Sequence, residues 1–254
     1  MERGERRRVA FVLPSFAGGG AERVPLTLAA SLDRKAFEPE IIVLDGTGPW
    51  QRLVPSHVPA FDLRRKRIRG AVLPLAGAIR RRRPAMAVST IGALNLALLA
   101  LAPVLPRETR LIVREANTPH RHAASRLGSR FYRWAYLRLS RRAATVIVPA
   151  GYLARELVEE FGVPRGKVTV LYNSIDEAAL DPAVRGPGHV SGKGVRFVAV
   201  GRLTRQKGFD RLLAMMAAAP ADSHLAILGE GPDRGPLEAQ RARLGLADRV
   251  SMLG

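Results

Sequence analysis

The sequence of 254 residues contains no cysteine. This absence excludes disulfide bonds, thiolate nucleophiles and cysteine-ligated zinc, and it agrees with a reducing compartment. Acidic residues are few as well: 22 aspartates and glutamates stand against 41 lysines and arginines, which gives a formal charge of +19 at pH 7. A charge of this size favours an anionic partner such as a phosphate compound, a nucleic acid or an acidic membrane surface.

A long hydrophobic run is also missing. The longest apolar stretch, 93–105, falls short of the roughly 20 residues that a membrane-spanning helix needs. The run at 9–13 is too short for the core of a signal peptide. We therefore expect a cytoplasmic protein. Its surface could bind it peripherally to the inner face of the cytoplasmic membrane.

Short β-branched runs alternate with longer helical stretches along the first part of the chain. Strands are predicted at 9–13, 41–44, 86–89, 111–113, 145–148 and 168–171. Helices are predicted at 21–32, 73–82, 94–101, 125–142 and 152–161. Continuous apolar strands separated by helices indicate a parallel sheet with both faces covered. We therefore predict that residues 1–180 form a Rossmann-like, doubly wound α/β domain.

Residues 181–194 form a polar stretch with several prolines and glycines, which predicts an interdomain linker. Beyond it, strands are predicted at 196–200, 225–228 and 250–253, and helices at 208–218 and 236–244. These patterns predict a second Rossmann-like parallel-sheet domain at 195–254. Since a doubly wound domain of typical size needs roughly 100–150 residues, we expect this domain to be incomplete and the chain to be the front part of a longer protein.

Gly18, Gly19 and Gly20 lie between the first predicted strand and the first predicted helix. Glycine allows the backbone to approach a ligand closely, and the free N–H groups of a helix N-terminus favour an anion. This loop is therefore a candidate phosphate-binding loop, with a plain flexible turn as the alternative. Glu22, in the first helical turn, could simply complement the helix dipole.

Two further loops follow strands of the second predicted domain, where open α/β sheets collect their ligands. One contains Gly201, Arg202 and Lys207, and its two cations could converge on one diphosphate. The alternative is a pair of solvated surface charges. The other loop contains Gly229 and Glu230, where a tight turn into the next helix is the structural alternative to contact with a ligand.

Histidines are few, and only His120 and His122 fall in a predicted strand-end loop. An idle surface histidine is the alternative to a catalytic role for either of them. The sequence has no H-E-x-x-H, no Walker A loop and no G-x-S-x-G, which argues against zinc proteases, P-loop ATPases and α/β-hydrolases.

Arginines are concentrated at 64–69, at 80–83 and in the predicted helix at 125–142, where they alternate with aromatic residues. Cations beside aromatic residues suit an anionic membrane interface, and they also suit a nucleic-acid backbone. The apolar stripe of this helix is expected to face the core. It comprises Leu127, Phe131, Ala135 and Leu139.

Together these segments resemble the retaining family 4 glycosyltransferases of the GT-B fold. FVLP at 11–14 and GGGAERV at 18–24 resemble the family's first strand and glycine loop. VLYNSID at 170–176 resembles the segment before the linker, where many members have N-G-[IV]-D. VGRL and KGFD within 200–210, ILGEGP at 227–232 and RVSMLG at 249–254 resemble the donor-domain signature and the strand that follows it.

In that family a nucleotide-activated sugar lies between two Rossmann-like domains. The resemblance implies that Arg202 and Lys207 are catalytic cations that hold the donor diphosphate, where fixed charges stabilise the departing anion. It also implies that the glycine loop lines the cleft from the acceptor side. The remaining donor contacts are expected from Gly201, Gly229, Glu230, Met252 and Leu253. No metal and no cofactor besides the donor substrate are expected.

Two departures from the family pattern affect the catalytic machinery. Many relatives carry a histidine in the loop that here reads REAN at 114–117, and His120, the candidate catalytic histidine, lies slightly after that place. The family's pair of glutamates would fall beyond position 254. We therefore expect the 254-residue chain to show no turnover on its own.

The sequence thus predicts a glycosyltransferase that moves a hexose-type sugar, with retention, from a UDP- or GDP-sugar to a cell-envelope or lipid-linked glycan acceptor. Its expected partners are the nucleotide-sugar donor, the acceptor and an anionic membrane surface, without nucleic acid. Two alternatives stay open. One is a nucleotide-sugar epimerase of the same fold, and the other is a non-catalytic basic module that binds nucleic acid or a membrane.

Overall fold

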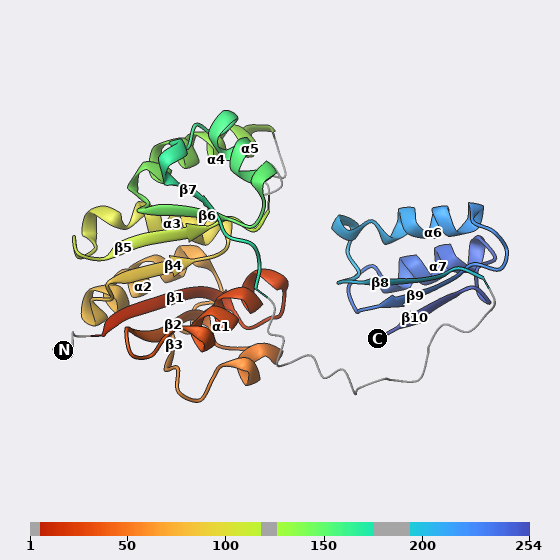
Figure 1. Cartoon of the computed structure of the whole chain (residues 1–254), viewed down its shortest axis with the longest axis horizontal. Helices are drawn as coiled ribbons and strands as arrows, with labels where there is room; N and C mark the ends of the chain where they lie inside the picture. The colour runs from red at the N-terminus through yellow and green to blue at the C-terminus, as the bar shows by residue number, and fades with distance from the viewer. Residues whose placement is uncertain (1–5, 118–125, 175–193) are drawn as a thin grey trace. The chain divides into compact units, whose positions relative to one another are not determined.

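The computed structural model describes residues 6–117, 126–174 and 194–254, with the backbone alone for 126–129. The chain divides into two units, Met1–Glu177 and Ala178–Gly254 (Figure 1). All but the last residue of the predicted linker at 181–194 lie outside the described residues, as do His120 and His122. The boundaries of the linker and the role of His120 therefore stay predictions.

The first unit is built on a seven-stranded sheet in which neighbouring strands are parallel, in the order β3-β2-β1-β4-β5-β6-β7. Its strands are β1 (Arg7–Ser15), β2 (Phe37–Asp45), β3 (Ala60–Asp62), β4 (Met86–Ser89), β5 (Arg110–Arg114), β6 (Thr145–Val148) and β7 (Val168–Val170). Its helices include α1 (Gly20–Ser31), α2 (Ile68–Arg82), α3 (Gly92–Ala100), α4 (Arg126–Leu139) and α5 (Gly151–Glu159). The predicted parallel α/β fold is confirmed, and each strand and helix predicted for this unit is present.

Different helices cover the two faces of this sheet. Successive residues of a strand point to opposite faces, so neighbouring residues of β1 pack against different helices. Ala10 and Val12 pack in one cluster with residues of α2, α3, α4 and α5. Phe11 and Leu13 pack in a second cluster with residues of α1 and of the loop after β2. Both sides of β1 are therefore buried, which explains its continuous apolar run.

The buried face of helix α4 differs in part from the prediction. The stripe expected to face the core is confirmed only in part: Phe131 is 66% exposed, whereas Leu139 is partly buried and packs against the core. Ala135 is buried as expected. Tyr136 packs edge-on against Phe161, with the ring centroids 5.9 Å apart. Tyr132 and Tyr136 thus take the place of Phe131 on the buried face of the helix, beside Ala135 and Leu139.

The second unit contains a three-stranded parallel sheet in the order β10-β9-β8. Its elements are β8 (Arg196–Val200), α6 (Phe209–Ala218), β9 (His224–Leu228), α7 (Arg234–Arg243) and β10 (Val250–Leu253), and all five are predicted from the sequence. Leu213 of α6 and Leu237 of α7 share one buried cluster with Leu225 and Ile227 of β9. Because the strands are parallel, the loops that follow them lie at one edge of the sheet.

The described part of the chain has neither a membrane-spanning helix nor a metal site of acidic and histidine side chains. No helix there has the length and the apolar character that a membrane crossing requires. Within the same residues, no group of three or more histidine, aspartate or glutamate side chains is placed to hold a metal ion.

Candidate functional site

The predicted donor residues lie at the carboxyl edge of the second sheet, where three loops come together. The N–H of Leu203 donates to the carbonyl oxygen of Glu230 at 2.9 Å. The N–H of Gly229 donates to the carbonyl oxygen of Leu253 at 3.0 Å. Backbone hydrogen bonds therefore join the ends of β8, β9 and β10 into one surface.

Gly229 and Gly231 make this close approach possible. A Cβ atom at Gly229 would lie 2.1 Å from the carbonyl oxygen of Gly201, and one at Gly231 would lie 2.2 Å from that of Leu203. Gly229 also has a φ of +143°, which L side chains rarely adopt. Glycine is therefore required at both positions, and the turn after β9 packs directly on the loop after β8.

Arg202 and Lys207 are both exposed on the loop after β8. Within the ranges that the structure describes, neither side chain takes part in an ion pair. The stem of Lys207 lies along the loop, since its Cδ is 3.7 Å from the Cβ position of Gly201. Among the described residues these two cations have no acidic partners, and they lie beside the closely packed glycine turn after β9. They are therefore suited to bind a diphosphate.

Arg234 connects the loop after β9 with strand β10, and the sequence analysis did not predict this role. Its Nη1 donates to Oε1 of Glu230 at 2.5 Å, and its Nη2 donates to the carbonyl oxygen of Met252 at 3.2 Å. Its Nε donates to Oε1 of Glu238 at 2.9 Å. The predicted contacts Glu230 and Met252 are therefore held together by one guanidinium. The signal in the sequence is the four-residue spacing of Glu230, Arg234 and Glu238, which is a helical ion-pair pattern.

In the first unit, the glycine loop leads from β1 into α1. Gly18 has a φ of +93°, and its Cβ position lies 3.4 Å from Nε1 of Trp50, so a side chain would be strained there. The carboxylate of Glu22 folds back over the loop, with Oε2 2.7 Å from the Cβ position of Gly19. Because this carboxylate already lies at the positive N-terminus of α1, the loop suits the lining of a site better than the binding of a phosphate.

A buried polar cluster at the end of β5 also escaped sequence reasoning. Oε1 of the fully buried Glu115 accepts a hydrogen bond of 2.7 Å from Nδ2 of Asn95 in α3. Burial raises the pKa of Glu115 to about 7, against the opposing effects of hydrogen bonds with Asn95 and Tyr136 and of the charge on Arg114. The signals in the sequence are a charged pair directly after an apolar strand and a lone asparagine in an apolar helix.

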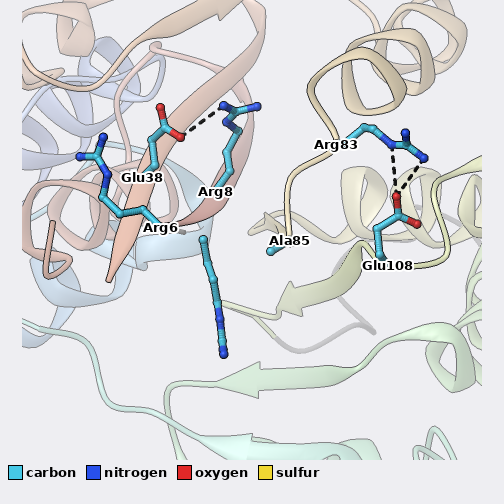
Figure 2. Close-up of a pocket in the computed structure, with 7 residues that line it drawn as sticks. Arg6, Arg8, Glu38, Arg83, Ala85 and Glu108 are labelled. Carbon is cyan, nitrogen blue, oxygen red and sulfur yellow. Dashed lines mark hydrogen bonds and ion pairs between the residues drawn. The ribbon is translucent and has the colours of Figure 1, made fainter. Parts of the chain in front are cut away.

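An open depression of about 450 Å³ lies at the amino edge of the first sheet, and Figure 2 shows residues that line it. On one side of it Arg8 pairs with Glu38 at 3.2 Å, and on the other Arg83 pairs with Glu108 at 3.1 Å. Solvent-exposed pairs of this kind contribute only about 0–1 kcal/mol each. Ligands of open α/β sheets bind at the carboxyl ends of the strands, so this depression is not the candidate site.

The two arginine clusters also lie at opposite edges of the first sheet. The cluster at 64–69 follows β3 at the carboxyl edge, and the cluster at 80–83 precedes β4 at the amino edge. In the second cluster, Arg82 pairs with the buried Glu40 at 2.8 Å and lies 3.5 Å over the ring of Phe61. Even so, Arg64 of the first cluster and Arg81 and Arg82 of the second line one open depression.

Known proteins resemble this chain in sequence. Residues 18–179 match the family model described as Glycosyltransferase Family 4. Over 160 residues the chain is 27% identical to a Campylobacter jejuni protein named N-acetylgalactosamine-N,N'-diacetylbacillosaminyl-diphospho-undecaprenol 4-alpha-N-acetylgalactosaminyltransferase. This match covers 61% of the chain and 42% of the relative, so the chain spans less than half of that protein's length.

Solved structures share the fold. Anabaena HepE in complex with UDP and glucose has a TM-score of 0.74 and 18% identity, with 98% of this chain and 69% of that chain covered. A Listeria monocytogenes protein named as a UDP-N-acetylglucosamine 2-epimerase has a TM-score of 0.63 and 15% identity, with 98% and 69% covered. At these identities the likeness shows the GT-B fold alone. The family model, by contrast, spans more than half of the sequence, and the chain therefore belongs to Glycosyltransferase Family 4.

Proposed function

We propose that the protein transfers a sugar, with retention, from a UDP- or GDP-sugar to a glycan or lipid-linked acceptor of the cell envelope. The observation that carries this proposal is the pair of exposed cations, Arg202 and Lys207, at the joined loops of the second sheet. Family membership supports sugar transfer. HepE binds UDP in its crystal structure, and the Campylobacter protein is named for transfer to a diphospho-undecaprenol-linked acceptor, which supports the proposed donor and acceptor.

The departing diphosphate is where negative charge develops in the proposed reaction. Arg202 offers two parallel N–H donors to phosphate oxygens, and Lys207 adds a compact charge from the same loop. The loop is fixed by its backbone contacts with the glycine turn after β9, so little reorganisation accompanies the reaction. In this mechanism the two cations, rather than a divalent metal, neutralise the leaving group.

Replacement of Arg202 tests the donor site by isothermal titration calorimetry with UDP and GDP. Loss of one charge-assisted contact in Arg202→Ala should cost about 1.5–3 kcal/mol, which weakens the affinity roughly 10- to 150-fold. Arg243→Ala removes the same charge from an exposed position in α7 and should leave the affinity nearly unchanged. Unaltered nucleotide affinity in Arg202→Ala would show that the donor site is wrongly assigned.

A nucleotide-sugar epimerase is the second candidate, because the Listeria protein named for that activity shares the fold. The two activities differ in their need for an acceptor. A transferase releases nucleotide when a glycan or lipid-linked acceptor is added, whereas an epimerase converts the donor sugar without one. Chromatography of donor and products, with and without a polyprenyl-diphosphate-linked sugar, separates the two.

We also propose that the outer face of α4 binds an anionic membrane surface. Phe131 and Trp134 are 66% and 58% exposed, with ring centroids 5.9 Å apart. Arg130, Arg133 and Arg138 are exposed on the same helix, which contains no acidic residue. Aromatic rings flanked by guanidinium groups suit the boundary between headgroups and acyl chains, where each cation contributes about 1 kcal/mol. Such a position would bring a lipid-linked acceptor to the first unit.

Flotation with liposomes tests this surface. At low salt the protein should float with anionic liposomes and not with zwitterionic ones, and Trp134→Ser should reduce the bound fraction. Leu73→Ser is the matched control, because Leu73 is 82% exposed on α2 and lies outside the proposed face. Equal binding to zwitterionic liposomes, or undiminished flotation of Trp134→Ser, would contradict the assignment.

A further inference from the structure

A small cavity lies at the carboxyl edge of the first sheet, between α1 and the segment that follows β7. Its volume is about 70 Å³. Its walls are mostly apolar and include Phe11 of β1, Leu28 of α1 and Ile147 of β6. Its polar lining comprises the exposed Tyr172 and Ser174 and two buried residues: Thr90, which directly follows β4, and Arg114, the last residue of β5. Neither of the two buried residues belongs to the proposed donor site or to the proposed membrane face.

The side chains of Thr90 and Arg114 are buried, and each has a hydrogen-bonding atom without a partner. Thr90 is 1% exposed and Arg114 is 4% exposed. Nη2 of Arg114 donates to Oδ1 of Asn173 at 2.5 Å, but in the part of the chain described, its Nη1 and the hydroxyl of Thr90 have no partner. Buried polar groups in native proteins are almost always hydrogen-bonded. Thr90 and Arg114 both line one cavity, and the unpartnered donor on each indicates a group from outside the protein.

The chemistry and the size of the cavity select an oxyanion. A guanidinium N–H forms charge-assisted bonds with phosphate or carboxylate oxygens, and a hydroxyl adds a second donor. One water needs roughly 10–15 Å³ of such space, so about 70 Å³ admits one phosphate or carboxylate group. It does not admit a nucleotide or a drug-sized ligand, whose pockets occupy about 300–1,000 Å³.

We propose that Thr90 and Arg114 bind a single phosphate or carboxylate group of the acceptor substrate. Assignment to the acceptor rests on the proposed function, because the cavity belongs to the first unit and adjoins α1, whereas the donor is assigned to the second unit. Asn173 accepts a hydrogen bond from the guanidinium and so fixes its orientation before the anion arrives. The apolar walls keep water from screening the charge of Arg114.

Calorimetric titration with inorganic phosphate tests the site. The titrations use proteins that also carry Arg202→Ala, so that phosphate binding at the loop after β8 does not contribute to the measured heat. Thr90→Val keeps the shape of the side chain and should weaken phosphate affinity about tenfold, while Arg114→Gln should abolish it. Arg110→Gln removes the same charge from an exposed position of β5 and should bind phosphate as its parent does. Equal affinities of Thr90→Val and its parent would overturn the site.

Two further measurements distinguish phosphate from carboxylate as the ligand, and they separate the oxyanion site from the proposed function. Acetate in the same titrations distinguishes a carboxylate preference from a phosphate preference. In crystals grown with selenate, an anomalous peak beside Thr90 and Arg114 would support the site, and a cavity that holds only water would overturn it. A wild-type protein that binds phosphate here but binds no nucleotide would refute the proposed function and leave the oxyanion site standing.

Discussion

Replacement of Glu115 by glutamine removes a fully buried charge at the end of β5 and keeps the shape of the side chain. Burial raises the pKa of Glu115 from 4.5 to about 7. The folded protein therefore holds this proton more tightly than the unfolded chain does. Stability from this group is present at low pH and is lost as the pH rises from about 4.5 through about 7.

The magnitude follows from the same two values. A rise of the pKa from 4.5 to about 7 corresponds to about 3 kcal/mol of unfolding free energy lost across this range. Glutamine stays neutral, and its Oε1 can still accept the 2.7 Å hydrogen bond from Asn95. Glu115→Gln also removes the attraction of Arg114, but the cost of burying the charge is the larger effect. We expect similar stabilities near pH 5 and a variant more stable by about 3 kcal/mol near pH 8.

Urea denaturation followed by tryptophan fluorescence measures this difference. Both tryptophans, Trp50 and Trp134, lie in the first unit, so the signal reports on the unit that contains Glu115. Glu108→Gln is the control, because it removes an exposed carboxylate and should shift stability by no more than about 0.5 kcal/mol. All three proteins contain the same five histidines, so the histidines' contribution to the pH dependence of stability cancels in the comparison. A difference between wild type and Glu115→Gln that does not vary with pH would refute the reasoning.

The second unit gives two further predictions. Arg234→Ala should weaken UDP affinity about tenfold, because the loop after β9 loses its guanidinium link to β10, and calorimetry measures the change. Gly231→Ala should lower the free energy of unfolding by about 1–3 kcal/mol, because its Cβ would lie 2.2 Å from a carbonyl oxygen. Gly235→Ala, which has open space around its Cβ position in α7, should instead be neutral or stabilising. Urea denaturation of both variants is followed by circular dichroism, because the two tryptophans lie in the first unit.

Much of the sheet is predictable from local patterns, because strands buried on both faces need continuous apolar runs. The predicted strands at 86–89 and 145–148 coincide with β4 and β6. Strand β3 is not predicted, since its three residues, Ala60–Asp62, show no apolar pattern and pairing with β2 alone defines it. Helix α2 begins at Ile68 rather than at 73, because the charged cluster at 64–69 obscures its first turn.

The orientation of α4 shows what periodicity leaves open. Phe131 and Ala135 are spaced as a helical stripe, and so are Tyr132 and Tyr136. Both pairs contain an aromatic side chain, so spacing alone does not decide which aromatic rings are buried. The contact of Tyr136 with Phe161 decides it, and this contact joins segments far apart in the sequence. The same reason applies to Arg234 and Glu115, whose neighbours become apparent only in the folded chain.

Arg114 and Glu115 connect the proposed oxyanion site to a titrating group. As consecutive residues at the end of a strand they point to opposite faces of the sheet, yet the charge of Arg114 lowers the pKa of Glu115 against the effect of burial. The other groups that face this carboxyl are Asn95 of α3 and Tyr132 and Tyr136 of α4. An anion beside Arg114 would offset its charge, so the pKa of Glu115 should rise when the anion binds.

Sulfate is the suitable probe of this coupling, because it does not titrate near neutral pH and phosphate does. If binding raises the pKa of Glu115 above about 7, binding takes up a proton, and sulfate affinity should fall as the pH rises through about 7. Glu115→Gln has no proton to take up at this position, so its sulfate affinity should vary less with pH than that of the wild type. Calorimetric titrations between about pH 6 and pH 8 measure both slopes. Identical slopes in the two proteins would show that the anion does not lie beside Arg114.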